Sequence, residues 1–199
     1  MLEEARSTPG RIEEKSDQEL VALTLVNQDD FIYLVDRYKH KLARYVRRLT
    51  NVALADIDDI LQDIFLKIYR NLNDYDQAMS FSSWAYRIAH NQVISNYRAI
   101  AARPQGNQVG LEDDGVGELV AEIDIEREVD EKLREQLIAR TLARLKPKYR
   151  EILVLKFFEE KSYEEISDIT RLPAGTVASR LSGAKKEFAR EFKKINKSV

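Results

Sequence analysis

Residues 162–188 read SYEEISDITRLPAGTVASRLSGAKKEF, and this stretch decides the fold expected for the C-terminal part of the chain. Ser162, followed by Glu165 three residues later, has the form of a capping box and predicts the start of a short helix. Residues 170–172 predict a tight turn, and Pro173 suits the first turn of a second helix. Apolar residues then recur at helical spacing and predict one buried stripe: Val177, Leu181, Ala184, Phe188, Phe192 and Ile195.

The opposite face of the second helix is polar and basic, which is typical of a helix-turn-helix that binds the major groove. A guanidinium such as that of Arg180 can bind guanine with two hydrogen bonds, and Thr176 and Ser179 can contact either kind of base. Lysines in such a helix suit phosphates. The candidate DNA-contacting residues of this helix-turn-helix (162–182) and its continuation are Arg171, Thr176, Ser179, Arg180, Ser182, Lys185 and Lys186. A helical hairpin with a solvated basic face remains the alternative.

Helical periodicity also dominates the rest of the chain and predicts an all-α fold. Ser16 and Glu19 form a second capping box, and the caps from Ser80 to Ser83 predict the start of a helix that runs to about Ile100. Pro147 is placed to open a helix over 148–159. Further apolar stripes are Phe31, Leu34, Val35, Tyr38, Leu42, Tyr45, Val46 and Leu49; Ile57, Ile60, Leu61, Ile64, Phe65, Ile68 and Leu72; and Val129, Leu133, Leu137, Thr141 and Leu145.

Composition divides the chain into two small domains. Residues 103–118 hold four of the seven glycines and a cluster of acids, which predicts a flexible linker. We therefore expect a disordered N-terminus (1–15), a helical bundle (16–102), an acidic linker (103–124) and a helix-turn-helix domain (125–199).

The net charge of −2 hides basic segments at both ends of an acidic middle. Residues 37–50 carry six Lys or Arg and no acid, and residues 171–199 carry eight against two Glu, whereas residues 104–135 carry eleven acids against three basic residues. Local basic patches attract phosphate. The absence of cysteine excludes disulfides and thiolate zinc sites, and without a long apolar run or a secretory signal we expect a cytoplasmic chain with no direct membrane insertion.

Three motifs resemble the ECF sigma factors of the σ70 superfamily: DDILQDIFLKIY (58–69), FSSWAYRIAHN (81–91) and LPAGTVASRL (172–181). The resemblance extends from about Asp17 to Lys194. It implies a non-enzymatic subunit without cofactor that binds the β′ and β subunits of RNA polymerase core and promoter DNA, and that is held inactive by an anti-sigma factor. The linker in such proteins threads toward the active cleft of the polymerase.

The resemblance also implies roles for named residues. Core-polymerase contacts fall on Asp59, Gln62, Asp63, Lys67 and Arg70. Contacts with the downstream (minus-10) element fall on Asn73, Tyr75, Gln77, Met79, Trp84, Arg87, His90, Asn91 and Arg98, with Trp84 held mainly as a packing residue. Contacts with the upstream (minus-35) element fall on the helix-turn-helix residues given above.

Three positions depart from the family pattern, and two other classes of function stay open. Ala178, Gly183 and Ser95 replace residue types common in relatives, so the DNA preference is expected to be unusual. A stand-alone helix-turn-helix regulator is the first alternative. The second is a metal-dependent nucleic-acid enzyme that uses Asp58, Asp59 and Asp63; no histidine or third oxygen ligand accompanies these acids, which argues against it.

Overall fold

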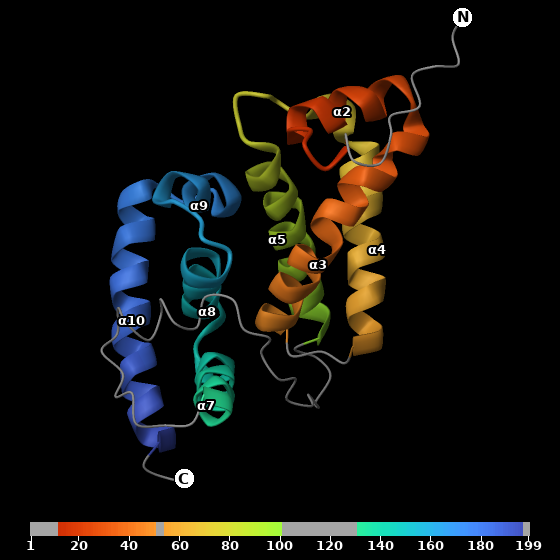
Figure 1. Cartoon of the computed structure of the whole chain (residues 1–199). Coiled ribbons are helices and arrows are strands. Elements are labelled where there is room, and N and C mark those ends of the chain that lie inside the picture. The colour runs from red at the N-terminus through yellow and green to blue at the C-terminus, as the bar shows by residue number, and fades with distance from the viewer. Residues whose placement is uncertain (1–11, 51–53, 101–130, 197–199) are drawn as a thin grey trace, which may run out of the picture.

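The computed structural model describes residues 12–50, 54–100 and 131–196, and within these ranges it contains helices and no strand. The first group of helices comprises α2 (Asp17–Val26), α3 (Phe31–Thr50), α4 (Leu54–Arg70) and α5 (Phe81–Ile100), with 3-10 turns at Gln28–Asp30 and Leu72–Asp74. The second group comprises α7 (Glu131–Arg144), α8 (Pro147–Leu153), α9 (Tyr163–Thr170) and α10 (Ala174–Asn196). Figure 1 shows the two groups side by side, with α3 and α5 next to α8 and α9. The all-helical prediction is confirmed. Within the described ranges, no helix has both the length and the apolarity needed to cross a bilayer.

Side-chain caps start three helices where the sequence predicts them. The Ser16 hydroxyl accepts from the Glu19 N–H at 3.3 Å, and the Glu19 carboxylate accepts from the Ser16 N–H at 2.7 Å. Ser162 and Glu165 repeat this reciprocal pair at 3.1 and 2.9 Å. The Ser80 hydroxyl accepts from the N–H of Ser83 at 3.1 Å and caps α5. Each cap satisfies N–H groups that have no partner within the helix.

The first bundle closes around α3, which packs against both α4 and α5. Its mostly aliphatic core contains aromatic pairs: the rings of Tyr38 and Phe81 meet edge to face with centroids 5.4 Å apart, and those of Tyr45 and Tyr86 at 5.2 Å. Each such edge-to-face pair contributes about 0.5–1.5 kcal/mol beyond the burial of its apolar area. Ile12, which falls in the predicted disordered N-terminus, is buried in this core, whereas Glu13 and Glu14 after it are exposed.

The second group is organised by α10, whose predicted stripe from Val177 to Ile195 is buried throughout. This stripe packs against α7 and α8. Of the stripe predicted for α7, Leu137, Thr141 and Leu145 are buried, while Val129 and the side chain of Leu133 lie outside the described residues.

The helix predicted over 148–159 differs in its second half. Pro147 stands in its first turn as expected, but α8 ends at Leu153 and a π-helical turn follows over Val154–Phe158. The N–H of Glu159 donates to the carbonyl of Val154, five residues back, at 3.1 Å. Hydrophobic spacing cannot reveal such a turn, because it changes the register by a single residue; π turns of this kind are frequent at functional sites.

Candidate nucleic-acid interface

The helix-turn-helix is built by α9, a three-residue turn and α10. α9 ends at Thr170, and the residue that follows it, Arg171, has a left-handed backbone with φ 57°. The Ser167 hydroxyl donates to the carbonyl of Leu172 at 2.5 Å and holds the turn. The carbonyl of Pro173 then accepts from the N–H of Val177 at 3.0 Å and begins α10. The left-handed residue is a common way to end a helix, although glycine usually occupies it.

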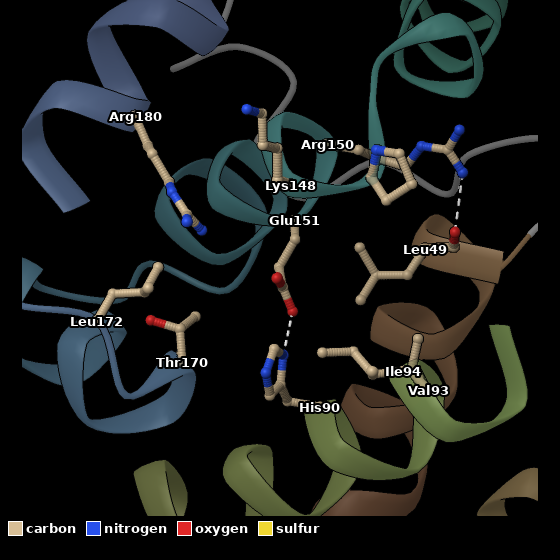
Figure 2. Close-up of a pocket in the computed structure, with 11 residues that line it drawn as sticks. Leu49, His90, Val93, Ile94, Lys148, Arg150, Glu151, Thr170, Leu172 and Arg180 are labelled. Carbon is tan, nitrogen blue, oxygen red and sulfur yellow. Dashed lines mark hydrogen bonds and ion pairs between the residues drawn. The ribbon is translucent and has the colours of Figure 1, made fainter. Parts of the chain in front are cut away.

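Most residues predicted to contact the upstream element lie on the surface of this unit, but Arg180 lines a cavity together with Val93 of α5 and Leu172 (Figure 2). Arg171, Ser179, Ser182 and Lys186 are exposed, and Thr176, Arg180 and Lys185 are half-buried. The hydroxyl of Ser179 donates to the carbonyl of Thr176 at 3.0 Å, so it is held against the helix backbone. Four exposed polar side chains on the outer side give α10 and its preceding turn a surface that a duplex can approach.

Two of the departures from the family pattern have a place in the structure. A Cβ at Gly183 would meet the ring of Tyr149 on α8, with the hydroxyl oxygen at 3.4 Å, so Gly183 lies at a helix–helix contact rather than on the DNA-facing side. Ala178 is exposed beside Ser179, and its methyl group offers no hydrogen bond at that position of the surface.

The loop between α4 and α5 has an ordered interior and a polar rim. Tyr75 is buried, its ring packs near Trp84 with centroids 5.3 Å apart, and its hydroxyl donates to the Met79 carbonyl at 2.7 Å. Asn73 and Gln77 are exposed. The structure therefore gives Tyr75 and Trp84 a packing role in this conformation and leaves the rim available to a ligand.

The predicted minus-10 residues of α5 divide between solvent and the second group of helices. Arg87 donates from Nε to the carbonyl of Asp168 in α9 at 2.7 Å, and burial, with the nearby charge of Arg171, lowers the pKa of Arg87. His90 is buried, and its Nδ1 is paired with the Glu151 carboxylate of α8. Asn91 is exposed, and the side chain of Arg98 lies outside the described residues.

Ser95 is exposed one turn after Asn91 on α5. Its hydroxyl donates to the carbonyl of Asn91 at 2.9 Å. The third departure from the family pattern is therefore satisfied within its own helix.

The polar face of α4 is exposed as predicted: Asp59, Gln62, Asp63, Lys67 and Arg70 all lie on the surface. A residue that the sequence reasoning missed organises part of this face. Gln92 of α5 is buried; its Nε2 donates to Asp63 at 2.9 Å, and its Oε1 accepts from Lys67. The sequence could have pointed to Gln92, since it stands directly before Val93 in the buried face of α5. An amide that is buried there requires hydrogen-bond partners.

The comparisons with known proteins agree with this architecture. Residues 34–103 match the family model "Sigma-70 region 2", and residues 135–188 match "Sigma-70, region 4". The ECF RNA polymerase sigma-E factor of Escherichia coli K12 is 35% identical over 179 residues, covering 87% of this chain and 92% of that protein. The ECF RNA polymerase sigma factor SigW of Bacillus subtilis is 30% identical, covering 85% and 92%.

Solved structures show the same fold. CnrH, determined in complex with the cytosolic domain of CnrY, has a TM-score of 0.65 and 26% identity, covering 88% of this chain and 96% of that one. The sigma factor RpoE of Bartonella quintana, in complex with the anti-sigma factor NepR, has a TM-score of 0.63 and 18% identity, covering 82% and 97%. Both domain models and full-length relatives at 30% identity or more thus match, and the chain belongs to the ECF family of RNA polymerase sigma factors.

Proposed function

We propose that this chain binds RNA polymerase core and directs it to promoters by reading two DNA elements, one with each group of helices. The observation that carries the proposal is the pairing, in one chain, of a helix-turn-helix with an exposed polar face on α10 and a bundle whose α4 presents an exposed polar face of its own. It acts by binding and catalyses nothing, in the cytoplasm where the polymerase works.

The face of α4 is proposed as the main contact with the β′ subunit. Asp59 and Gln62 are exposed and project from a rigid helix, so they can form hydrogen bonds with a partner without ordering a loop first. Asp63 and Lys67 are held by Gln92, which fixes their geometry before the partner arrives. Preorganisation of this kind raises affinity because less conformational freedom is lost on binding.

The second group is proposed to read the upstream element as duplex, and the first to hold the downstream element as single strand. Arg180 is proposed to contact a base edge, and the lysines beside it to contact phosphates. The rim of the loop after α4 supplies exposed amides, Asn73 and Gln77, that can bind the edges of unstacked bases. Extracting a base from the duplex costs a few kcal/mol, and binding to core and to both elements has to supply that free energy.

CnrH was determined with the cytosolic domain of CnrY bound, and RpoE of Bartonella quintana with the anti-sigma factor NepR bound. We propose that an anti-sigma factor likewise holds this chain inactive until a signal releases it.

The test is transcription with purified core polymerase and genomic DNA fragments of the source organism, with mapping of the RNA 5′ ends. Start sites that share two sequence elements, and that appear only when the chain is added, are the expected result. Binding to DNA without any effect of the chain on start sites would instead favour a stand-alone helix-turn-helix regulator.

A further inference from the structure

A cavity of about 390 Å³ lies between the two groups of helices, and the proposed function assigns no ligand to it. Residues of α3, α5, α8, α9 and α10 all line it (Figure 2). The volume corresponds to about a dozen water molecules, at roughly 30 Å³ each. It also falls within the range of about 300–1,000 Å³ that is usual for sites of small molecules. The cavity is therefore large enough for a small organic ligand.

The wall of the cavity is mostly apolar. Leu49 of α3 and Val93 of α5 belong to the core of the first group, and Leu172 comes from the turn between α9 and α10. Ile94 of α5 also lines the cavity and is 41% exposed. Covering such a side chain with hydrocarbon removes apolar surface from water, which is the main favourable term in most binding. The wall thus favours a ligand with an apolar body.

The one acid among the lining residues is already paired. The Glu151 carboxylate of α8 accepts from the Tyr45 hydroxyl at 3.3 Å and is paired with Nδ1 of His90. Arg150 is held as well, because its Nη1 donates to the carbonyl of Leu49 at 2.8 Å. Figure 2 shows the contact of Glu151 with His90 and that of Arg150 with Leu49. These groups are engaged by the protein itself, so other side chains have to recognise the polar part of a ligand.

Two cationic side chains remain for an anionic head group. Arg180 of α10 is half-buried and turned toward the cavity (Figure 2), and within the described part of the chain no carboxylate pairs with it. Lys148 of α8 is exposed and also lines the cavity. The lining thus carries three cations, Lys148, Arg150 and Arg180, against the single carboxylate of Glu151. A guanidinium can bind a carboxylate through two parallel hydrogen bonds, and partial burial strengthens that attraction.

We infer that the cavity is a binding site for a small amphiphilic carboxylate, of the class of medium-chain fatty acids. The apolar body lies against Val93, Ile94 and Leu172, and the carboxylate is held by Arg180 with Lys148 beside it. A neutral molecule of the same length gains only the apolar contacts. A cationic one is repelled by the excess of positive charge in the lining.

Occupation of the cavity affects DNA binding, and this step rests on the proposed function. The guanidinium of Arg180 cannot hold a carboxylate and contact a base edge at the same time. The ligand and the upstream element therefore compete, and each lowers the affinity of the chain for the other by the same factor. We expect amphiphilic acids to reduce initiation by this chain.

The first experiment measures binding to the full-length chain by NMR, with octanoate as the probe and octanol as its neutral counterpart. We expect octanoate to shift the amide signals of residues around the cavity, and octanol to bind about tenfold more weakly. Arg180→Gln should lower the affinity for octanoate about tenfold and leave that for octanol unchanged. Lys186→Ala removes an exposed cation of the same helix outside the lining, so it is the matched control and should bind octanoate as the parent chain does.

A second variant fills the cavity and leaves the cations in place. Ile94→Trp adds a large ring at a position where the parent side chain is partly exposed, so both octanoate and octanol should lose their site while the melting temperature stays the same. Equal affinities of the parent chain for octanoate and octanol would overturn the inference. Binding of octanoate to I94W as tightly as to the parent chain would do so too, as would shifts confined to residues away from the cavity.

Transcription separates the binding site from the proposed function. Octanoate, at a concentration that saturates the NMR shifts, should reduce the yield of open complex of the parent chain with core polymerase about tenfold and should leave the yield of I94W at its own starting level. If octanoate binds in the cavity and the yield does not change, the competition for Arg180 is wrong and the binding site stands. If the parent chain confers no start-site selectivity even without octanoate, the proposed function fails and the NMR result alone decides the site.

Discussion

Arg87 of α5 donates from Nε to the backbone carbonyl of Asp168 in α9, at 2.7 Å. A residue expected to hold promoter DNA is thus bound to the neighbouring DNA-reading unit in the free chain. The partner is a carbonyl rather than a carboxylate, so the hydrogen bond does not depend on the identity of residue 168. DNA phosphates or bases can replace a single carbonyl without leaving a buried acid unpaired.

Arg87→Ala is expected to reduce open-complex formation at a cognate promoter more than it reduces binding to the closed duplex. The guanidinium is proposed to stabilise the separated strand, so its loss acts on the melted state. Permanganate reactivity of unpaired thymines measures the open complex, and a gel shift measures binding to the closed duplex. We expect about a tenfold loss of reactive complex, equivalent to about 1.4 kcal/mol.

The matched control is Arg140→Ala, which removes an exposed arginine of α7. It should change neither measurement. A loss of equal size in the closed and open complexes of Arg87→Ala would place this residue on a phosphate of the duplex.

Asp59→Ala with Gln62→Ala is expected to weaken binding to core polymerase at least tenfold. Both side chains are exposed on α4, so we expect their loss to remove contacts with the partner and to leave the packing of the bundle unchanged. Asp63 is a poorer choice because it also accepts from Gln92 within the bundle. Fluorescence anisotropy of the labelled full chain, titrated with core, measures the affinity.

Asp56→Ala, on the first turn of the same helix, serves as the control for that pair. It changes an exposed carboxylate outside the proposed contact and should leave the affinity for core within twofold. If both variants bind core as tightly as the parent chain does, α4 is not the docking helix.

Much of this fold could be predicted from local sequence patterns, because helix caps and apolar stripes depend only on residues close together in the sequence. The capping boxes at Ser16 and Ser162 and the stripe of α10 required only spacing of a few residues along one helix. The pair of Arg48 and Glu159 lies 111 residues apart in sequence, and no periodicity predicts which buried charges will meet. The π turn before Glu159 was equally hidden, although it sets the position at which this carboxylate leaves the helix.

The candidate site was predicted less completely than the fold, for the same reason. Sequence placed Asp63 and Lys67 on an exposed face, and they lie there, but the amide that connects them comes from another helix. The resemblance to the family implied a DNA contact for Tyr75, whereas in the structure Tyr75 is buried by aromatic packing with Phe81 and Trp84. The DNA contacts themselves stay predictions.

Arg180→Ala is expected to cost about 1–3 kcal/mol in binding a cognate upstream element and little in binding random DNA. A guanidinium that contacts a base edge discriminates between sequences, whereas one on a phosphate does not. Lys186→Ala is the comparison. Loss of this exposed lysine should weaken both complexes alike, and it should reduce by about one the slope of the logarithm of the binding constant against the logarithm of the salt concentration. Equal losses on both DNAs for Arg180→Ala would assign it to a phosphate.

Gly183→Ala is expected to stabilise the chain by about 0.5–1 kcal/mol, because glycine in a helix interior is less favourable than alanine by that amount. The new methyl group would meet the Tyr149 hydroxyl at 3.4 Å, an ordinary contact distance. Thermal unfolding followed by circular dichroism measures the gain. Gly183→Leu overfills the same contact and should lower the melting temperature; a loss with alanine as well would show that Tyr149 cannot shift.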